Sequence, residues 1–228
     1  MNFRKALSAT AFCIAAALGT SAAASPVDIS NTIGVGSISP FGASNTATYG
    51  QTFTADSIYH YLTGFSLFLN GRVGGTSLNL RGYIGAWDGS KATSILYTSS
   101  TRSMGVDGLS TEFSFDTSSL DLVGGSQYVA FLSISELGLQ SQSTYSMPYT
   151  GNNIAGGTLV FLNNGTNFGA LTSTTWDCPG CIPSLDMAFK AQFSETGITQ
   201  VPEPGSLALA GIALAGLFAA RRKKYRRA

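Results

Sequence analysis

The chain has 228 residues and a formal net charge of +1, with 44% hydrophobic, 11% aromatic and 11% charged residues. This length fits one ordinary domain or two small ones, and the apolar and aromatic content excludes a disordered chain of low hydrophobicity. The near-neutral charge hides an asymmetry, because residues 25–200 hold five basic and eleven acidic side chains whereas both ends are basic. An acidic body lacks the positive surface that binds nucleic acid, so no nucleic-acid partner is expected.

Residues 1–24 have the features of a secretory signal peptide. The basic pair Arg4–Lys5 precedes an apolar stretch at residues 9–18, and Ala22–Ala24 offers a small-residue cleavage site. About ten apolar residues cover roughly 15 Å as a helix, which is too short to span a bilayer. Export with cleavage before Ser25 is therefore predicted, against the alternative of an uncleaved amphipathic start.

Residues 25–200 are dominated by the alternation of apolar and polar side chains that is typical of half-buried strands. The clearest example is residues 185–194, where Leu185, Met187, Phe189, Ala191 and Phe193 alternate with mostly polar neighbours. Further strands are predicted at residues 65–70, 78–86, 112–116, 128–134 and 159–161, and weaker ones at 48–55 and 94–98.

Dipeptides that suit tight turns separate these segments, namely Asn70–Gly71, Asp88–Gly89, Asp107–Gly108 and Asn164–Gly165. No sustained helical period occurs in this region, and residues 135–142 are the one short helical candidate. The sequence therefore predicts an all-β fold, an antiparallel β-sandwich of jelly-roll-like type, as one body over residues 25–200.

Few residues of this body suggest catalysis. His60 is the sole histidine and is expected at the surface, since a hydrolytic triad needs a base together with a nucleophile elbow that the body lacks. The acids at Asp88, Asp107, Asp116 and Asp121 adjoin turn residues, so we expect solvated turn carboxylates; a calcium site and a pair of glycosidase carboxylates remain alternatives. The sequence predicts no catalytic residue, no metal and no cofactor.

Two tryptophans are candidates for stacking on a glycan. Trp87 precedes the Asp88–Gly89 turn and Trp176 precedes Asp177, so both are expected at loop edges, although such rings are also common in sandwich cores.

The compact motif Cys178-Pro-Gly-Cys181 is the other constellation in the body. A zinc half-site would lack partner ligands, and a redox pair would lack the helix start that activates a thiol. In an oxidising compartment, a small loop closed by a Cys178–Cys181 disulfide is the favoured interpretation.

The C-terminal segment, residues 201–228, has three parts in a fixed order. The motif Pro202-Glu203-Pro204 is followed by an uncharged apolar stretch at residues 207–220 and by a basic cluster, Arg221, Arg222, Lys223 and Lys224. As a helix the apolar stretch covers about 21 Å, a short transmembrane span with the basic cluster left in the cytoplasm.

These three parts, in this order, resemble the PEP-CTERM sorting signal of exported Gram-negative proteins, a segment also described as an ice-binding-protein C-terminal motif. The resemblance implies recognition by an exosortase, transient insertion in the inner membrane and removal of the tail on sorting. It implies delivery to the cell envelope or the extracellular space and no particular chemistry.

The sequence as a whole thus predicts an exported, non-catalytic protein of the cell envelope or extracellular matrix, with a structural, adhesive or exopolysaccharide-associated role. A carbohydrate-binding module is the alternative, and a glycan-active hydrolase is the less favoured one.

Overall fold

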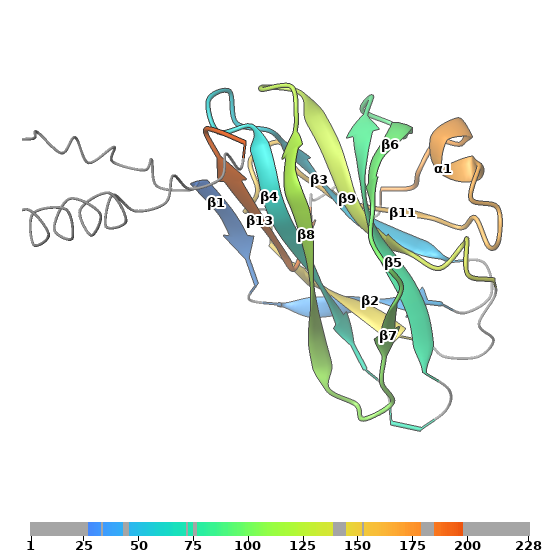
Figure 1. The fold of residues 1–228 in the computed structure, drawn as a ribbon. Coiled ribbons are helices and arrows are strands. Elements are labelled where there is room, and N and C mark those ends of the chain that lie inside the picture. Colours follow the sequence, from blue (N-terminus) through green and yellow to red (C-terminus); the bar gives the residue numbers. More distant parts are fainter. Residues whose placement is uncertain are drawn as a thin grey trace, which may run out of the picture.

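The computed structural model describes residues 27–32, 34–42, 46–71, 73–74, 77–138, 145–151, 153–178 and 185–197. These residues form two antiparallel sheets that face each other, with one short helix beside them (Figure 1). The two sheets confirm the all-β prediction and its sandwich character, while the jelly-roll-like connectivity stays a prediction. The signal peptide and the C-terminal segment predicted to cross the membrane lie outside the described residues.

The first sheet has seven strands arranged around the long strand β4. In β4, Phe65 pairs with Ala191 on one side and with Phe115 on the other. The strands of this sheet are β1 (Val27–Asn31), β2 (Gly36–Phe41), β4 (Tyr61–Asn70), β8 (Ser110–Asp121), β10 (Tyr145–Thr150), β12 (Asp186–Met187) and β13 (Phe189–Ser194).

The second sheet has six strands, and the helix lies beside it. Its members are β3 (Thr48–Thr54), β5 (Leu78–Trp87), β6 (Ala92–Thr98), β7 (Arg102–Met104), β9 (Gln127–Ser133) and β11 (Leu159–Leu162). The helix α1 (Ala170–Ser173) follows β11 and lies next to β6 and β11 (Figure 1).

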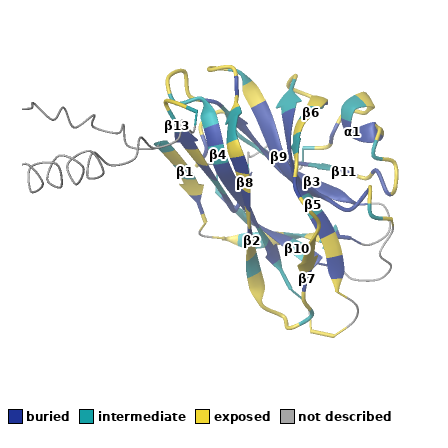
Figure 2. Ribbon diagram, in the orientation of Figure 1, coloured by how far each residue is buried: buried dark blue, intermediate teal, exposed yellow. Residues whose placement is uncertain are grey.

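The main core lies between the two sheets, because alternate side chains of each strand point inward. Phe53 of β3 packs against Phe189 and Phe193 of β13, with ring centroids 5.6 and 6.0 Å apart. Gly82 of β5 is required by this packing, since a Cβ atom there would lie 2.5 Å from the ring of Phe115 in β8. Figure 2 shows the buried residues concentrated where the sheets face each other, with exposed residues along β1 and β8.

The strand predicted over residues 185–194 is confirmed with one break. The break is at Ala188, whose amide still donates to the carbonyl of Pro148 in β10 (2.9 Å) before β13 begins at Phe189. The chain thereby passes from β12, which pairs with β10, to β13, which pairs with β1 and β4.

The predicted turns are mostly confirmed by positive φ angles at Gly89, Gly108 and Gly165. Gly71 differs, because its amide donates to the carbonyl of Leu109 (2.8 Å) and prolongs the pairing of β4 with β8. The helical candidate at 135–142 is a turn in its described residues, and the helix occurs at Ala170–Ser173 instead.

Within the described ranges, none of the helices has the length and apolar character needed to cross a membrane.

Candidate functional site

The outer face of the six-stranded sheet is covered by its own chain. The segment after β11, which includes α1, packs on this face and forms a second apolar cluster with β5, β6 and β9. We call this surface the covered face; its buried members are Tyr83, Ala92, Val129, Phe131, Val160, Leu162, Ala170, Leu171 and Trp176.

Trp176 belongs to that second cluster and is 4% exposed. Its indole Nε1 donates to the carbonyl of Leu171 (2.9 Å), and its ring meets Phe131 edge-to-face at 5.2 Å. The prediction of a glycan-stacking role for Trp176 is therefore corrected, because its ring is used in packing. Trp87 lies against Trp176 at 5.5 Å and stays partly exposed, so its candidate stacking role remains a prediction.

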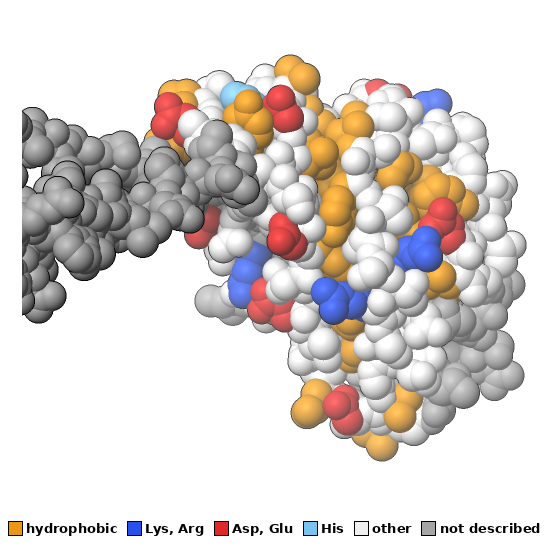
Figure 3. Space-filling model, viewed as in Figure 1, with side chains coloured by type: hydrophobic (Ala, Val, Ile, Leu, Met, Phe, Trp, Pro, Cys, Tyr) orange, Lys and Arg blue, Asp and Glu red, His pale blue; other side chains and the backbone are white. Residues whose placement is uncertain are grey.

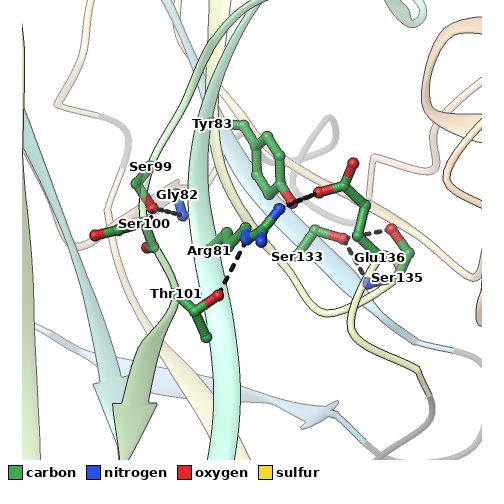
Figure 4. Close-up of polar contacts among 9 residues, drawn as sticks. All are labelled: Arg81, Gly82, Tyr83, Ser99, Ser100, Thr101, Ser133, Ser135 and Glu136. Carbon is green, nitrogen blue, oxygen red and sulfur yellow. Dashed lines mark hydrogen bonds and ion pairs between the residues drawn. The ribbon is translucent and has the colours of Figure 1, made fainter.

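A polar cluster adjoins the covered face through Tyr83, and Figure 4 shows its contacts. The Arg81 guanidinium contacts Glu136 Oε2 at 2.7 Å, and the Tyr83 hydroxyl donates to the same oxygen at 3.0 Å. Arg81 Nε also donates to Thr101 Oγ1 (3.2 Å). Burial raises the pKa of the Tyr83 phenol above its ordinary value, and the hydrogen bond to Glu136 adds to this effect.

This cluster joins β5 to the connection after β6 and to the turn after β9. Its members are far apart in the sequence, which is why sequence reasoning missed them. Because the charges of Arg81 and Glu136 are paired with each other and with Tyr83, the arrangement is suited to holding three segments together.

The outer face of the seven-stranded sheet has a different character. The alternation of β4 directs Phe68 and Asn70 outward, while Leu67 and Leu69 enter the core. Figure 3 shows mostly white along β8, the colour of the remaining side chains and the backbone, beside a band of orange hydrophobic side chains. We call this surface the open face.

Two hollows follow one another along β4 on the open face. The first has a volume of about 420 Å³, and its lining includes Ser37, Phe68, Asn70, Ser110, Pro148 and Ala188. The second has a volume of about 200 Å³, and its lining includes Gly64, Ser66, Glu112, Ser114, Lys190 and Gln192.

An ion pair stands at the junction of the two hollows. Lys190 Nζ lies 2.9 Å from each carboxylate oxygen of Glu112 and 5.3 Å from the ring centre of Phe68. Burial raises the pKa of Glu112, but hydrogen bonds from Lys190, Ser66 and Ser114 outweigh it and leave the pKa below its ordinary value. Glu112 is thus ionised near neutral pH, and its charge is matched by Lys190.

The loop carboxylates serve as turn caps, as the sequence suggested. Asp88 accepts hydrogen bonds from the amides of Ser90 (2.8 Å) and Lys91 (2.9 Å), and these bonds lower its pKa. Asp107 and Asp116 accept from amides two residues further on in the same way. Within the described part of the chain, no group of three or more His, Cys, Asp or Glu residues could hold a metal ion.

His60 lies at the surface next to Asp121. Its Nε2 is 3.6 Å from Asp121 Oδ1, and its ring packs on Tyr61 with centroids 4.7 Å apart. The predicted surface position of His60 is confirmed.

Asp186 is a buried carboxylate that the sequence analysis did not single out. It is 0% exposed and accepts hydrogen bonds from Gln51 Nε2 (2.7 Å) and from the amides of Asn153 (2.7 Å) and Ile154 (2.8 Å). Gln51 also binds the backbone of β12, because its Oε1 accepts a hydrogen bond from the amide of Met187 (2.7 Å). The network links β3 of one sheet to β12 of the other.

The Cys178-Pro-Gly-Cys181 motif is described only at its first residue. Cys178 Sγ lies 3.4 Å from Thr158 Oγ1, and Cys181 lies outside the described residues. The disulfide stays a prediction.

The comparisons with known proteins concern the end of the chain. Residues 200–223 match the family model of the PEP-CTERM protein-sorting motif. Neither the curated proteins nor the solved structures contain a match to the chain. The match confirms the resemblance drawn from Pro202, Glu203, Pro204 and the basic cluster, and it supports an exported protein that an exosortase processes.

Proposed function

We propose that this chain is an exported, non-catalytic protein of the cell envelope or extracellular matrix, with a structural, adhesive or exopolysaccharide-associated role. The observation that carries the proposal is the sorting motif at residues 200–223, which follows directly on a β-sandwich. Its partners are the exosortase and, through the apolar segment 207–220, the inner membrane before processing.

The use of the acidic side chains supports a non-catalytic role. Asp88, Asp107 and Asp116 cap turns, Glu136 is paired with Arg81, and Asp186 holds backbone amides in the interior. A glycosidase needs two carboxyl groups that face one another across a substrate, one of them with a raised pKa. The carboxyl groups with resolved pKa changes, Asp56, Asp88 and Glu112, are shifted downward.

A carbohydrate-binding module is the second candidate, and one observation favours it. The open face carries two adjoining hollows, of which the first has a mainly polar lining and the second a mixed polar and apolar one, whereas the covered face uses its aromatic rings for packing. Binding to a matrix polysaccharide and a structural role in that matrix are compatible.

Loss of the sorting motif tests the proposal. We expect the triple variant Pro202→Ala, Glu203→Ala, Pro204→Ala to remain as full-length precursor in the membrane fraction, because the exosortase would not recognise it. Fractionation of the producing cells and immunoblotting with an antibody against the body would detect both forms. The matched control is Glu195→Ala, an exposed acid outside the motif, which should be processed normally. Normal release of the triple variant would overturn the proposal.

A further inference from the structure

The geometry points to the open face as a binding groove for a neutral polysaccharide, which runs along β4 and across the two hollows. This inference deepens the proposed function and rests on it, since an exported protein meets such polymers. The groove is defined by Ser37, Ser66, Phe68, Asn70, Ser110 and Gln192.

The lining has the chemistry that sugar hydroxyls require. Serine hydroxyls and the amides of Asn70 and Gln192 can each donate and accept hydrogen bonds, which suits a ligand covered with hydroxyl groups. Ser37, Ser110 and Gln192 are exposed, so they can reach a ligand without a change of fold. The Ser66 and Ser114 hydroxyls lie 2.9 Å apart and also hydrogen-bond Glu112, so they offer a ligand acceptor lone pairs, and of the two Ser114 is exposed.

One aromatic ring stands near the middle of the groove. Phe68 is half-buried and lines the first hollow, and its register partner Glu112 lines the second. Sugar rings present apolar C–H faces that pack against aromatic rings, so Phe68 supplies a contact that the hydroxyl and amide groups cannot.

The length of the groove suits a polymer. Gly64, Ser66, Phe68 and Asn70 line the two hollows in succession along β4, and the six residue steps from Gly64 to Asn70 cover about 20 Å. A channel of that length accommodates several sugar units in an extended chain. Its open, polar form contrasts with the enclosed and mainly apolar pockets that hold small organic molecules.

The charges favour a neutral polymer over an acidic one. Among the described residues that line the two hollows, the charged ones are Lys190 and Glu112, and they neutralise each other at 2.9 Å. The body from residue 25 to residue 200 has six more acidic than basic side chains, which disfavours the approach of a polyanion.

The test uses the protein purified from the producing cells after export. Affinity electrophoresis in native gels would measure its retardation by dextran, laminarin and the polysaccharide shed by those cells, with alginate as the acidic comparison. The key variant is Ser110→Trp, which fills the first hollow. Its matched control is Ser103→Trp, an equally exposed serine in β7 of the other sheet.

We expect at least one neutral polysaccharide to retard the protein and Ser110→Trp to weaken that binding about tenfold or more, while Ser103→Trp leaves it unchanged. Phe68→Ala should weaken binding about threefold to tenfold, and Phe68→Tyr, which keeps the ring, should retain it. Equal thermal midpoints of the two tryptophan variants show that folding is not the cause.

Three results would contradict the proposal that this groove binds a neutral polysaccharide. They are no retardation by any of the neutral polymers, stronger binding to alginate than to them, or equal binding by Ser110→Trp and Ser103→Trp. Each is distinguishable from failure of the proposed function, because sorting of the Pro202-Glu203-Pro204 variant is measured by fractionation and not by binding.

Discussion

The two outer faces of the sandwich differ in what happens to the side chains that point outward from their strands. On the covered face, outward residues such as Tyr83 and Phe131 are large and aromatic, and the segment with α1 buries them. On the open face, the outward residues of β8 include Ser110, Glu112, Ser114 and Asp116, and they stay exposed. The covered face adds stability through buried apolar area, and the open face keeps its polar groups available to a ligand.

The aromatic residues of the two faces also have different surroundings. Trp176 is surrounded by other rings and has its indole N–H bonded, whereas Phe68 has polar neighbours and one cation above its ring. An aromatic residue on the covered face should matter for folding, and one on the open face should matter for binding.

Trp176→Ala should have the largest effect on stability. Removal of a buried aromatic side chain leaves a cavity and lowers the free energy of unfolding by about 3–5 kcal/mol. Urea denaturation followed by circular dichroism would measure it. Trp87→Ala, which removes the partly exposed neighbour, is the control and should cost clearly less. A loss below about 1 kcal/mol for Trp176→Ala would contradict the account of the covered face.

Asp186→Ala should come next, because the buried network joins the two sheets. The change leaves the amides of Asn153 and Ile154 and the amide group of Gln51 without their acceptor, which should cost about 2–3 kcal/mol. Denaturation of Asp177→Ala provides the comparison with an exposed acid nearby. Equal denaturation midpoints for Asp186→Ala and Asp177→Ala would show that the network does not stabilise the contact between β3 and β12.

Tyr83→Phe tests the polar cluster at the border of the covered face. Loss of the hydroxyl that donates to Glu136 should lower the free energy of unfolding by about 1 kcal/mol, a moderate value because Glu136 is partly exposed. A double-mutant cycle with Glu136→Ala, which removes the acceptor, would measure the coupling. Strict additivity of the two changes would mean that the hydrogen bond contributes nothing.

Phe68→Ala should cost about 1 kcal/mol or less of stability, since the side chain is half-buried on the open face. The same denaturation series as for Trp176→Ala would show the contrast. A loss as large as that of Trp176→Ala would remove the distinction between the two faces.

Glu112→Gln should have the smallest effect, below about 1 kcal/mol, because the ion pair with Lys190 is partly exposed and screened by solvent. The pKa of Glu112 is lowered in the folded state, so its contribution is fully present above the unfolded-state pKa of about 4.3 and is lost as the pH falls through the folded-state value. The stability difference between wild type and variant should therefore be constant from about pH 6 to pH 8 and shrink at lower pH. A difference that grows on acidification would contradict this assignment.

Much of the fold could be predicted from the sequence, because in β8 and β13 one strand face is apolar and the other mostly polar. The alternation at residues 185–194 and 112–116 appears in β13 and β8, although β8 extends further in both directions. The strands that were missed, β1, β2, β7 and β10, are short or contain proline, and tertiary pairing defines them more than their own pattern does.

The candidate site was less accessible to sequence reasoning. Trp176 stands beside a loop in the sequence, and nothing local shows that Leu171 and Phe131 would enclose it. The groove draws on β2, β4, β8, β10 and β13, so Ser37, Asn70 and Ser110 become neighbours through strand pairing alone. A signal was available in the outward positions of β8, where Ser110, Glu112, Ser114 and Asp116 recur at every second place.

The central claim is that the open face, and not the covered face, binds the ligand. The most direct test measures how strongly the same neutral polysaccharide retards two variants in native gels. If the open face binds, Trp87→Ala migrates like the wild type, with full retardation, which would reject the predicted stacking role of Trp87, while Ser110→Trp runs as if the polymer were absent. The reverse outcome, with retardation lost in Trp87→Ala and kept in Ser110→Trp, would contradict it and place binding on the covered face.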